Sequence, residues 1–277
     1  MIQLIRGFRD ILPGEVELWQ KIEREARELL ERFGFREIRI PILEKTELFR
    51  RSIGEETDIV EKEMYTFADR GGEAVTMRPE ATASIVRAYI QHKLYAPDPA
   101  KRLYTIGPMF RRERPQKGRY RQFTQIDAEI LGVASPLADA ELVFLLTSLL
   151  RRLAVEDVSA HVNSLGCAAC RPSFRLALQE MLAAVSDRLC EDCSRRRVRN
   201  PLRVLDCKVP ECREALAGAP SILEHLCGDC RRDFDLLRDA LESLGVPYVV
   251  DPRLVRGLDY YTRATFEIQT GALGAQS

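Results

Sequence analysis

The sequence has no excess of charge of either sign, because its 277 residues contain 42 Lys and Arg against 42 Asp and Glu. A uniformly basic surface for nucleic acid is therefore excluded, and a polyanionic partner must be bound by local clusters of cations. Hydrophobic residues make up 45% of the chain and charged residues 30%. These fractions exclude a disordered chain and favour a globular protein of one large or two ordinary domains.

Long apolar runs are also missing. The longest strongly apolar stretch, residues 142–150, has nine residues and includes Thr147 and Ser148. A membrane-spanning helix needs about 20 residues, so we expect no membrane span. The first ten residues include Arg6, Arg9 and Asp10 and lack the apolar core of a signal peptide. We therefore expect a cytoplasmic protein whose eight cysteines are thiols or metal ligands.

The first half of the chain mixes helical and strand patterns. Apolar residues recur every three or four positions in residues 14–33, 80–92 and 136–153, which predicts helices. Residues 36–40, 103–110 and 122–131 have strand patterns. Residues 64–67 and 74–77 flank Asp69-Arg70-Gly71-Gly72, a sequence typical of a hairpin turn.

The composition changes after Ser164, because residues 167–230 contain all eight cysteines among pieces of helical periodicity. Strand patterns return after Pro247, in residues 248–250 and 260–269. We predict an α+β fold, with an antiparallel sheet flanked by helices and a mostly helical insertion. The predicted domains are a core of residues 1–164, the insertion of residues 165–246, and a return to the core in residues 247–277. Strands and helices do not alternate regularly, which argues against a doubly wound parallel sheet.

The densest charge cluster is residues 110–123, which contain six cationic side chains, Lys117 among them, and one carboxylate. Arginine matches the geometry of phosphate and carboxylate with paired hydrogen bonds. Tyr120 and Phe123 within the same stretch favour stacking on a nucleotide base. The segment is therefore a candidate nucleotide-binding loop, and a solvated charged loop is the alternative.

Gln125, Asp127 and Glu129 occupy alternate positions on the predicted strand that follows, so their side chains share one face. Together with the arginine-rich loop they predict a pocket for a cation-bearing small molecule next to a phosphate. An exposed polar face of an edge strand is the alternative. Farther along, Tyr260 and Tyr261 are adjacent in a predicted strand, so we expect them to point to opposite faces and only one to enter a pocket.

These segments together resemble the class II aminoacyl-tRNA synthetases, and within them the histidyl-tRNA synthetase family. Arg39-Ile40-Pro41 is similar to motif 1 of the class and Phe110-Arg111-Arg112-Glu113 to motif 2. The resemblance to the histidyl family lies in residues 77–82, 118–123 and 256–261, the last of which read Arg256-Gly257-Leu258-Asp259-Tyr260-Tyr261. It extends over nearly the whole chain.

The resemblance implies a role for each matching residue. In the family, groups at these positions hold the amino group of histidine (Glu80, Thr82 and Gln125), its imidazole nitrogens (Glu129 and Tyr261, with Tyr260 in the same site), and its carboxylate (Arg111). Arg111 and Arg256 would contact the α-phosphate of ATP as the catalytic pair. The remaining ATP contacts would be made by Glu113, Arg119 and Phe123, the last by stacking on adenine.

The implied activity is that of a histidine–tRNA ligase, which activates histidine with ATP and Mg²⁺ and then transfers it to its tRNA. A homodimer with Pro41 near the interface is implied as well. The chain stops at Gln276-Ser277, before the family's motif 3 and anticodon-binding domain. We therefore expect a truncated fragment that binds histidine weakly and does not charge tRNA. Two alternatives are a non-catalytic, histidine-sensing paralogue, the regulatory subunit of an ATP phosphoribosyltransferase, and a zinc-stapled tRNA-binding module.

The cysteines form four pairs, three of them with the two-residue spacing of zinc knuckles. The pairs are Cys167/Cys170, Cys190/Cys193, Cys207/Cys212 and Cys227/Cys230. The sequence predicts structural zinc, with the joining of the pairs left open, and reduced cysteines packed among helices are the alternative. The basic run of residues 195–203 is a candidate contact for tRNA phosphates or a solvated helix face.

Overall fold

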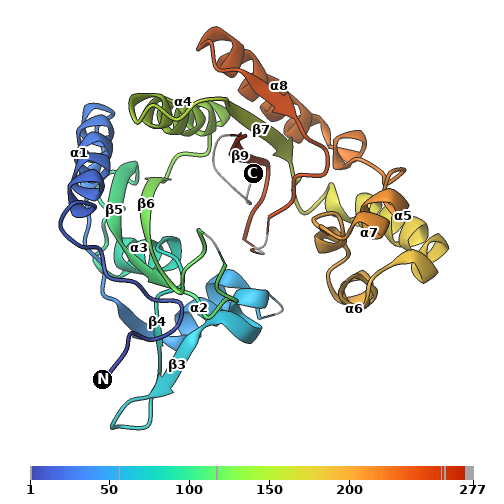
Figure 1. Cartoon of the computed structure of the whole chain (residues 1–277). Helices are drawn as coiled ribbons and strands as arrows, with labels where there is room; N and C mark the ends of the chain where they lie inside the picture. The colour runs from blue at the N-terminus through green and yellow to red at the C-terminus, as the bar shows by residue number, and fades with distance from the viewer. Residues whose placement is uncertain (1, 56, 117, 257, 259, 272–277) are drawn as a thin grey trace. The chain divides into compact units, whose positions relative to one another are not determined.

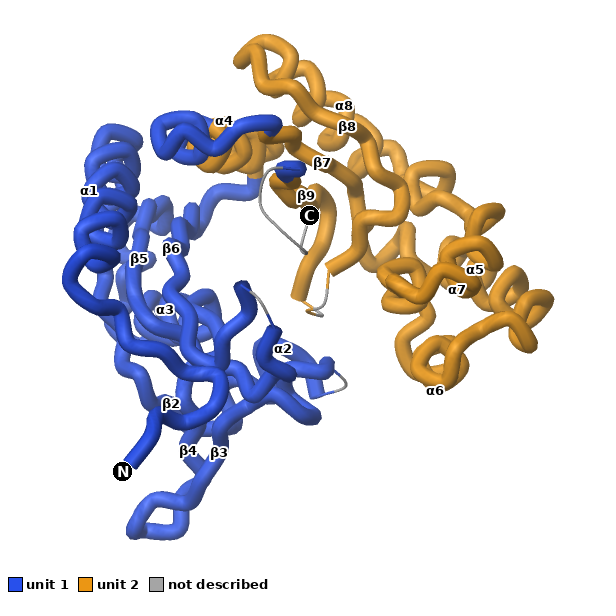
Figure 2. The backbone as a smooth tube through the Cα atoms, in the orientation of Figure 1, with its two compact units in different colours: residues 1–134, 148–157, 270–277 blue, residues 135–147, 158–269 orange. Residues whose placement is uncertain are grey.

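The computed structural model describes residues 2–55, 57–116, 118–256, 258 and 260–271 (Figure 1). Lys117, Gly257, Asp259 and the last residues Gln276-Ser277 lie outside the described residues. The chain divides into two compact units, which Figure 2 distinguishes by colour. Unit 1 contains residues 1–134, 148–157 and 270–277, and unit 2 contains residues 135–147 and 158–269. The division into a core and an insertion that the composition suggested stays a prediction.

Unit 1 begins with helix α1 (Val16–Arg32), where the sequence pattern predicted a helix. Its apolar stripe buries Ala26, Leu29 and Leu30, and the charged residues of its other positions face solvent. Gly34 has φ of +77°, a conformation that ends the helix at little steric cost.

The first sheet of unit 1 has the strand order β1-β5-β6. Strands β5 (Lys101–Phe110) and β6 (Gln122–Leu131) are antiparallel over their whole length, with Lys101 opposite Leu131 and Phe110 opposite Gln122. Strand β1 (Arg36–Glu37) is parallel to β5 and shorter than predicted. Helix α3 (Thr82–Gln91) packs Ile85 against Leu103 and Met109 of β5 in one apolar cluster.

The second sheet of unit 1 has the order β2-β4-β3, formed by β2 (Leu43–Lys45), β3 (Tyr65–Ala68) and β4 (Ala74–Met77). The predicted hairpin is confirmed. In its turn, Asp69 Oδ1 accepts hydrogen bonds from the N–H groups of Gly71 and Glu73 at 2.8 and 2.9 Å. Helix α2 (Thr46–Ile53) buries Phe49 and Ile53.

Unit 2 contains a sheet of order β8-β7-β9. Its strands are β7 (Val158–Ser164), β8 (Tyr248–Val250), which is parallel to β7, and β9 (Ala264–Thr270). Helices α4 (Pro136–Arg152) and α8 (Gly228–Ser243) contribute Val143 and Leu237 to the apolar cluster that β7 completes with Val162.

The segment between β7 and α8 is mostly helical, as predicted. It contains α5 (Arg171–Ala184), α6 (Glu191–Arg199) and α7 (Pro210–Ala215). Phe174, Leu178 and Leu182 of α5 form its core with buried cysteines of the later segments. Among the described residues, none of the helices combines the length and the apolarity that a membrane span requires.

Candidate active site

Strand β6 presents Gln125, Asp127 and Glu129 at alternate positions, as its regular pairing with β5 requires. We call these three residues the polar row. Their side chains are half-buried, although β6 is an edge strand in the order β1-β5-β6. A half-buried polar row is a candidate site for a ligand that offers hydrogen-bond donors or positive charge.

The N-terminus of helix α3 adds two further predicted residues to the polar row. Thr82 Oγ1 donates a hydrogen bond to Glu129 Oε1 at 2.6 Å. Glu80 is only 4% exposed, and its Oε1 accepts the N–H of Ala83 at 3.0 Å. Burial raises the pKa of Glu80 and the pKa of Glu129. The structure therefore brings Glu80, Thr82 and Glu129 together, as the sequence predicted.

Asp127 is the residue of the polar row to which the family resemblance assigned no individual contact. Burial, with added repulsion from Glu129 and Glu80, raises the pKa of Asp127 to about 7. Its Oδ2 and Gln125 Oε1 are buried and accept no hydrogen bond within the described residues. Two unsatisfied acceptors beside clustered carboxyl groups are the pattern expected of a pocket that a cationic donor fills.

Arg78 also has a role that the sequence did not reveal. Its guanidinium donates to the carbonyl oxygens of Pro108 at 2.9 Å and Ile40 at 2.6 Å. A Cβ at residue 107 would lie 2.6 Å from Arg78 Nη2, so the glycine there leaves room for the guanidinium. Arg78 therefore joins the segment after β1 to the end of β5. This role depends on hydrogen bonds to backbone carbonyls that are distant in the sequence, so only the folded structure reveals it.

The predicted ATP residues of unit 1 also lie close together. Arg111 Nε donates to Pro79 O at 2.9 Å, and its guanidinium carbon lies 5.3 Å from the centre of the Phe123 ring. Glu113 Oε2 lies 2.7 Å from Arg119 Nη1, and its Oε1 lies 3.9 Å from Arg111 Nη1. The arrangement places two guanidinium groups and an aromatic face at one end of the polar row's strand pair, which suits a nucleotide phosphate and base.

Part of the charge in the arginine-rich loop serves to hold the N-terminal segment. Arg121 donates from Nη1 of its guanidinium to Arg6 O at 3.2 Å, and its backbone N–H donates to Gly7 O at 2.7 Å. The guanidinium of Arg9 lies 5.3 Å from the centre of the Tyr120 ring. Tyr120 and Arg121 are thus engaged within the protein, and the loop is not simply a solvated charge run.

The remaining predicted residues, Arg256, Tyr260 and Tyr261, belong to unit 2. The expectation that the two tyrosines point to opposite faces of a strand is wrong. Strand β9 begins only at Ala264, and the two rings stack with centres 5.0 Å apart and planes 15° apart. Arg256 lies 5.4 Å above the Tyr261 ring and 3.3 Å from Glu267 Oε2. Since Arg111 belongs to unit 1, its convergence with Arg256 stays a prediction.

The four cysteine pairs join in a way that the sequence left open. The first tetrad contains Cys167, Cys170, Cys227 and Cys230, and the second contains Cys190, Cys193, Cys207 and Cys212. Within each tetrad all sulfur atoms lie within 4.8 Å of one another. Four thiolates at about 2.3 Å from one tetrahedral zinc ion would lie about 3.8 Å apart. Both tetrads therefore fit the donor set and spacing of a four-thiolate zinc site.

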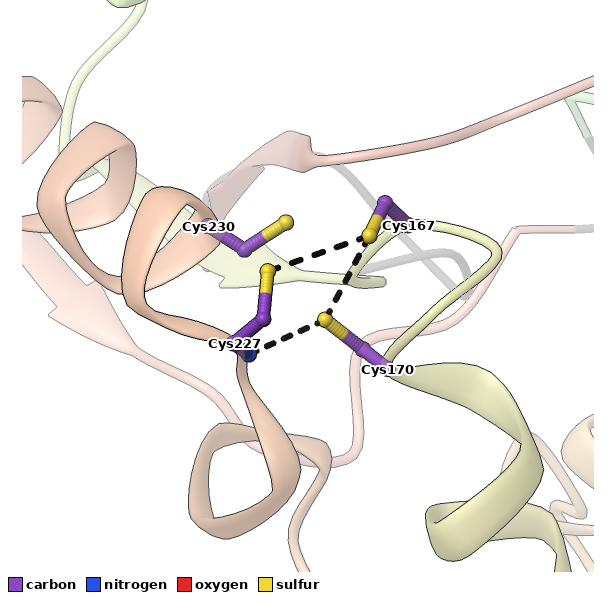
Figure 3. A group of neighbouring side chains, drawn as sticks. All are labelled: Cys167, Cys170, Cys227 and Cys230. Atoms are coloured by element: carbon purple, nitrogen blue, oxygen red, sulfur yellow. Dashed lines mark hydrogen bonds between the residues drawn. The ribbon is translucent and has the colours of Figure 1, made fainter.

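Figure 3 shows how the first tetrad is assembled from two distant segments. Cys167 Sγ lies 3.6 Å from Cys170 Sγ and 3.9 Å from Cys227 Sγ, and the N–H of Cys227 donates to Cys170 Sγ at 3.1 Å. Backbone N–H groups lower the pKa of Cys167 to about 6 and also lower the pKa of Cys227. N–H groups directed at sulfur favour the thiolate form that binds metal.

The chain is similar to known proteins over nearly its whole length. The family profile described as "Histidyl-tRNA synthetase" matches residues 7–275. The chain is 66% identical over 277 residues to a protein of Desulforapulum autotrophicum named histidine–tRNA ligase, and 65% identical to one of that name from Desulfatibacillum aliphaticivorans. Each match includes 100% of this chain but 65% and 66% of the relative, so the chain spans slightly less than two thirds of their length.

A solved structure confirms the predicted fold class. The crystal structure of apo S. aureus histidyl-tRNA synthetase superposes with a TM-score of 0.76 at 36% sequence identity. The match includes 97% of this chain and 61% of that one. The α+β class II synthetase fold that the sequence motifs implied is therefore present.

Proposed function

Because the chain belongs to the histidyl-tRNA synthetase family, we propose that it provides the histidine and ATP contacts of an enzyme that activates histidine with ATP and transfers the histidyl group to tRNA. The observation that carries the proposal is the joining of Thr82 to Glu129 beside the buried Glu80, on the strand pair whose connecting loop holds Arg111 and Glu113. The polar row and the arginine-rich loop lie in one compact unit. Such an arrangement serves the condensation of a carboxylate with a phosphate.

Histidine is the proposed amino acid because the pocket offers acceptors for both its ends. Glu80, Thr82 and Gln125 would hold the ammonium group, and Glu129, with Tyr261 and Tyr260 of unit 2, would hold the imidazole. The free acceptor of Gln125 and the raised pKa values of Glu80 and Glu129 support this assignment, because a bound cation would satisfy and stabilise such groups. A site built for hydrogen bonds rejects apolar analogues by about 10⁴–10⁵.

In the first step, a carboxylate oxygen of histidine attacks the α-phosphorus of ATP and pyrophosphate leaves, which forms histidyl-adenylate. Arg111 and Arg256 would offset the negative charge of the two reacting anions. Glu113 and Arg119 would orient ATP, and Phe123 would stack on adenine. Positioning and electrostatic stabilisation contribute most of the acceleration in such phosphoryl chemistry. Mg²⁺ bound by the phosphates would neutralise part of their charge.

In the second step, a hydroxyl of the terminal ribose of tRNA attacks the carbonyl carbon of the adenylate, and AMP leaves. The proposed partners are therefore histidine, ATP and the histidine tRNA, and the place of action is the cytoplasm, where tRNA is used. We also propose a homodimer through the segment around Pro41. The exposed side chains of Ile42 and Leu43 beside it support an interface there, and sedimentation analysis would test it.

The histidine site is tested by Glu129→Gln, with Glu28→Gln on the exposed face of α1 as the matched control. Histidine should raise the melting temperature of the parent and of the control but not that of Glu129→Gln. Replacing the carboxylate by an amide keeps the shape of the side chain and removes its charge. If histidine leaves the melting temperature of the parent unchanged, the proposed function is wrong for this chain.

The nucleotide site is tested by Arg111→Gln, with Arg70→Gln in the exposed hairpin turn as the control. Loss of one donor to a developing charge typically lowers a rate by about 10²–10³. We expect a decrease of that order in single-turnover adenylate formation for Arg111→Gln and an unchanged rate for Arg70→Gln. Equal rates in the parent and Arg111→Gln would contradict the assigned role.

Each cysteine tetrad is proposed to hold one structural zinc ion. The sulfur spacing and the reduced state of all eight cysteines support this proposal. A four-thiolate site has no open position for substrate, so its contribution is to folding. The insertion has a small core, and such cores commonly need a metal or disulfide for stability. Elemental analysis of protein purified without chelator should find two zinc ions per chain.

A further inference from the structure

The turn that leads into the first tetrad is hydrogen-bonded to the residues that follow Tyr261. Leu165 N donates to Arg263 O at 2.7 Å, and Arg263 N donates to Gly166 O at 2.9 Å. The hydroxyl of Thr262 donates to the same carbonyl of Gly166 at 3.0 Å. Gly166 is the residue immediately before Cys167, so the metal-binding turn and the tyrosine segment share one set of backbone hydrogen bonds.

Arg171 adds a side-chain link between the same two segments. It directly follows Cys170 at the start of α5, and its Nε donates to Leu165 O at 3.3 Å. Its Nη2 donates to the carbonyl oxygen of Tyr261. Gly166 has φ of +59°, and a Cβ there would lie 2.7 Å from the Cβ of Cys170. The turn is thus tightly packed, and a shift of Cys170 displaces both Gly166 and Arg171.

A small cavity confirms that the two segments adjoin within unit 2. It has a volume of about 60 Å³ and is lined by Arg171 together with Arg256 and Tyr261. Arg256 and Tyr261 are the proposed phosphate and imidazole contacts of this unit. The start of the insertion therefore borders the wall that carries the proposed substrate contacts.

We propose that metal in the first tetrad acts as a positioning site for substrate, in addition to stabilising the fold. The inference rests on the proposed function. Zinc bound by Cys167, Cys170 and their partners would fix the turn at residues 165–171. That turn holds Tyr261 through Arg171 and Gly166, and Arg256 packs on Tyr261. Arg171 is a positioning residue, because it acts on the carbonyl of Tyr261 and has no assigned contact with substrate.

The second tetrad provides an internal comparison. Its Cys193, Cys207 and Cys212 are part of the apolar core of the insertion, against which Val255 packs. This contact with the residue before Arg256 is apolar and lacks the direction of the hydrogen bonds around Gly166. Metal in the second tetrad should therefore stabilise the insertion with a weaker effect on histidine binding.

The test compares Cys170→Ser with Cys193→Ser, each the buried second cysteine of its first pair. Each variant should retain one zinc ion where the parent has two. Calorimetric titration of the whole chain with histidine should give a Kd raised on the order of tenfold in Cys170→Ser, and by no more than about twofold in Cys193→Ser, the size of a coupling near 0.5 kcal/mol. Equal increases in both variants would overturn the inference.

Arg171→Ala keeps the inference testable should Cys170→Ser fail to fold. It should retain two zinc ions and the melting temperature of the parent to within a few degrees, yet bind histidine as weakly as Cys170→Ser. Arg171→Lys should restore part of the affinity, since lysine can still donate to the carbonyl of Tyr261. The control is Arg175→Ala on the exposed face of the same helix, which should bind histidine like the parent.

A spectroscopic measurement separates positioning from general stability. With Co²⁺ in place of zinc, Cys193→Ser carries cobalt in the first tetrad and Cys170→Ser carries it in the second. Saturating histidine should change the visible spectrum of cobalt in the first case and leave it unchanged in the second. If the spectrum of cobalt-loaded Cys193→Ser does not change, the positioning inference is wrong but the proposed function still stands. If the parent binds no histidine, both the inference and the proposed function are wrong.

Discussion

The polar row of strand β6 and the first cysteine tetrad both gather groups that become anionic, but their titration behaviour differs, because the tetrad combines thiols of lowered pKa with Cys230, whose pKa burial raises to about 12. Burial raises the pKa of Asp127 to about 7 and also raises the pKa of Glu129. In the tetrad, backbone N–H groups lower the pKa of Cys167 to about 6 and lower the pKa of Cys227. Burial thus disfavours ionisation of the two carboxyl groups, whereas backbone N–H groups favour ionisation of the thiols of Cys167 and Cys227.

The difference corresponds to the kind of partner each cluster suits. A pocket that keeps its carboxyl groups partly protonated has a modest attraction for cations, and a substrate that must leave again is bound reversibly. Thiolates held by N–H groups at closely spaced positions suit a metal that stays bound as part of the fold. The comparison predicts different responses of the two clusters to removal of a ligand and to pH.

Metal removal should have the largest effect. Zinc binding by small structural domains is worth about 10–16 kcal/mol, and it is coupled to their folding. A strong chelator should therefore abolish the cooperative unfolding of the helical segment, measured by circular dichroism during heating. Excess zinc should restore it, and excess histidine should not. The predicted difference between the two clusters would be wrong if protein purified without chelator contained no zinc and its unfolding were unchanged by the chelator.

The pH dependence of stability should change when Asp127 is replaced by Asn. In the unfolded chain the carboxyl group has a pKa of about 4, and in the folded chain its pKa is about 7. The folded state therefore holds the proton more tightly, and stability is lost as pH rises from about 4 to 7. From pH 5 to 8 the parent should lose about 2–3 kcal/mol relative to Asp127→Asn, measured by urea unfolding. Parallel profiles would contradict the raised pKa.

Thr82→Val should have a smaller effect, confined to the polar row. The change removes the 2.6 Å hydrogen bond to Glu129 and leaves a buried carboxyl oxygen without its donor, which costs about 1–3 kcal/mol. We expect a lower melting temperature and weaker histidine binding. Thr66→Val, which breaks a 2.8 Å hydroxyl pair with Thr76 in the second sheet, should lower the melting temperature without changing the histidine Kd. If both variants bind histidine equally, Thr82 has no part in the pocket.

Regular local patterns made much of unit 1 predictable. Alternation of side chains in a strand placed Gln125, Asp127 and Glu129 on one face, and the Asp-Arg-Gly-Gly sequence located the hairpin turn. These signals depend only on neighbouring residues and standard backbone geometry. The roles of Glu80 and Thr82 at the start of α3 were predicted from the motif resemblance, and the periodicity alone did not indicate them.

Features set by long-range packing could not be predicted from the sequence. The pairing of cysteines into tetrads depends on how separate segments meet, 60 residues apart in the first tetrad and 17 to 22 apart in the second, and spacing leaves it open. Tyr260 and Tyr261 have high strand propensity, yet the chain turns before Ala264 and stacks their rings. The pKa of Asp127 depends on its burial and on repulsion from Glu129 and Glu80, which the sequence does not encode locally.

Arg78 links two surfaces that are usually considered separately. Its guanidinium donates one hydrogen bond to Ile40 O, next to the proposed subunit contact. It donates another to Pro108 O, near the end of β5 that leads into the arginine-rich loop. A rigid, planar cation thus joins these two carbonyl groups. Association of two chains at Pro41 would therefore stiffen the loop that receives ATP, and a dilute, dissociated preparation should lose nucleotide affinity before it loses its secondary structure.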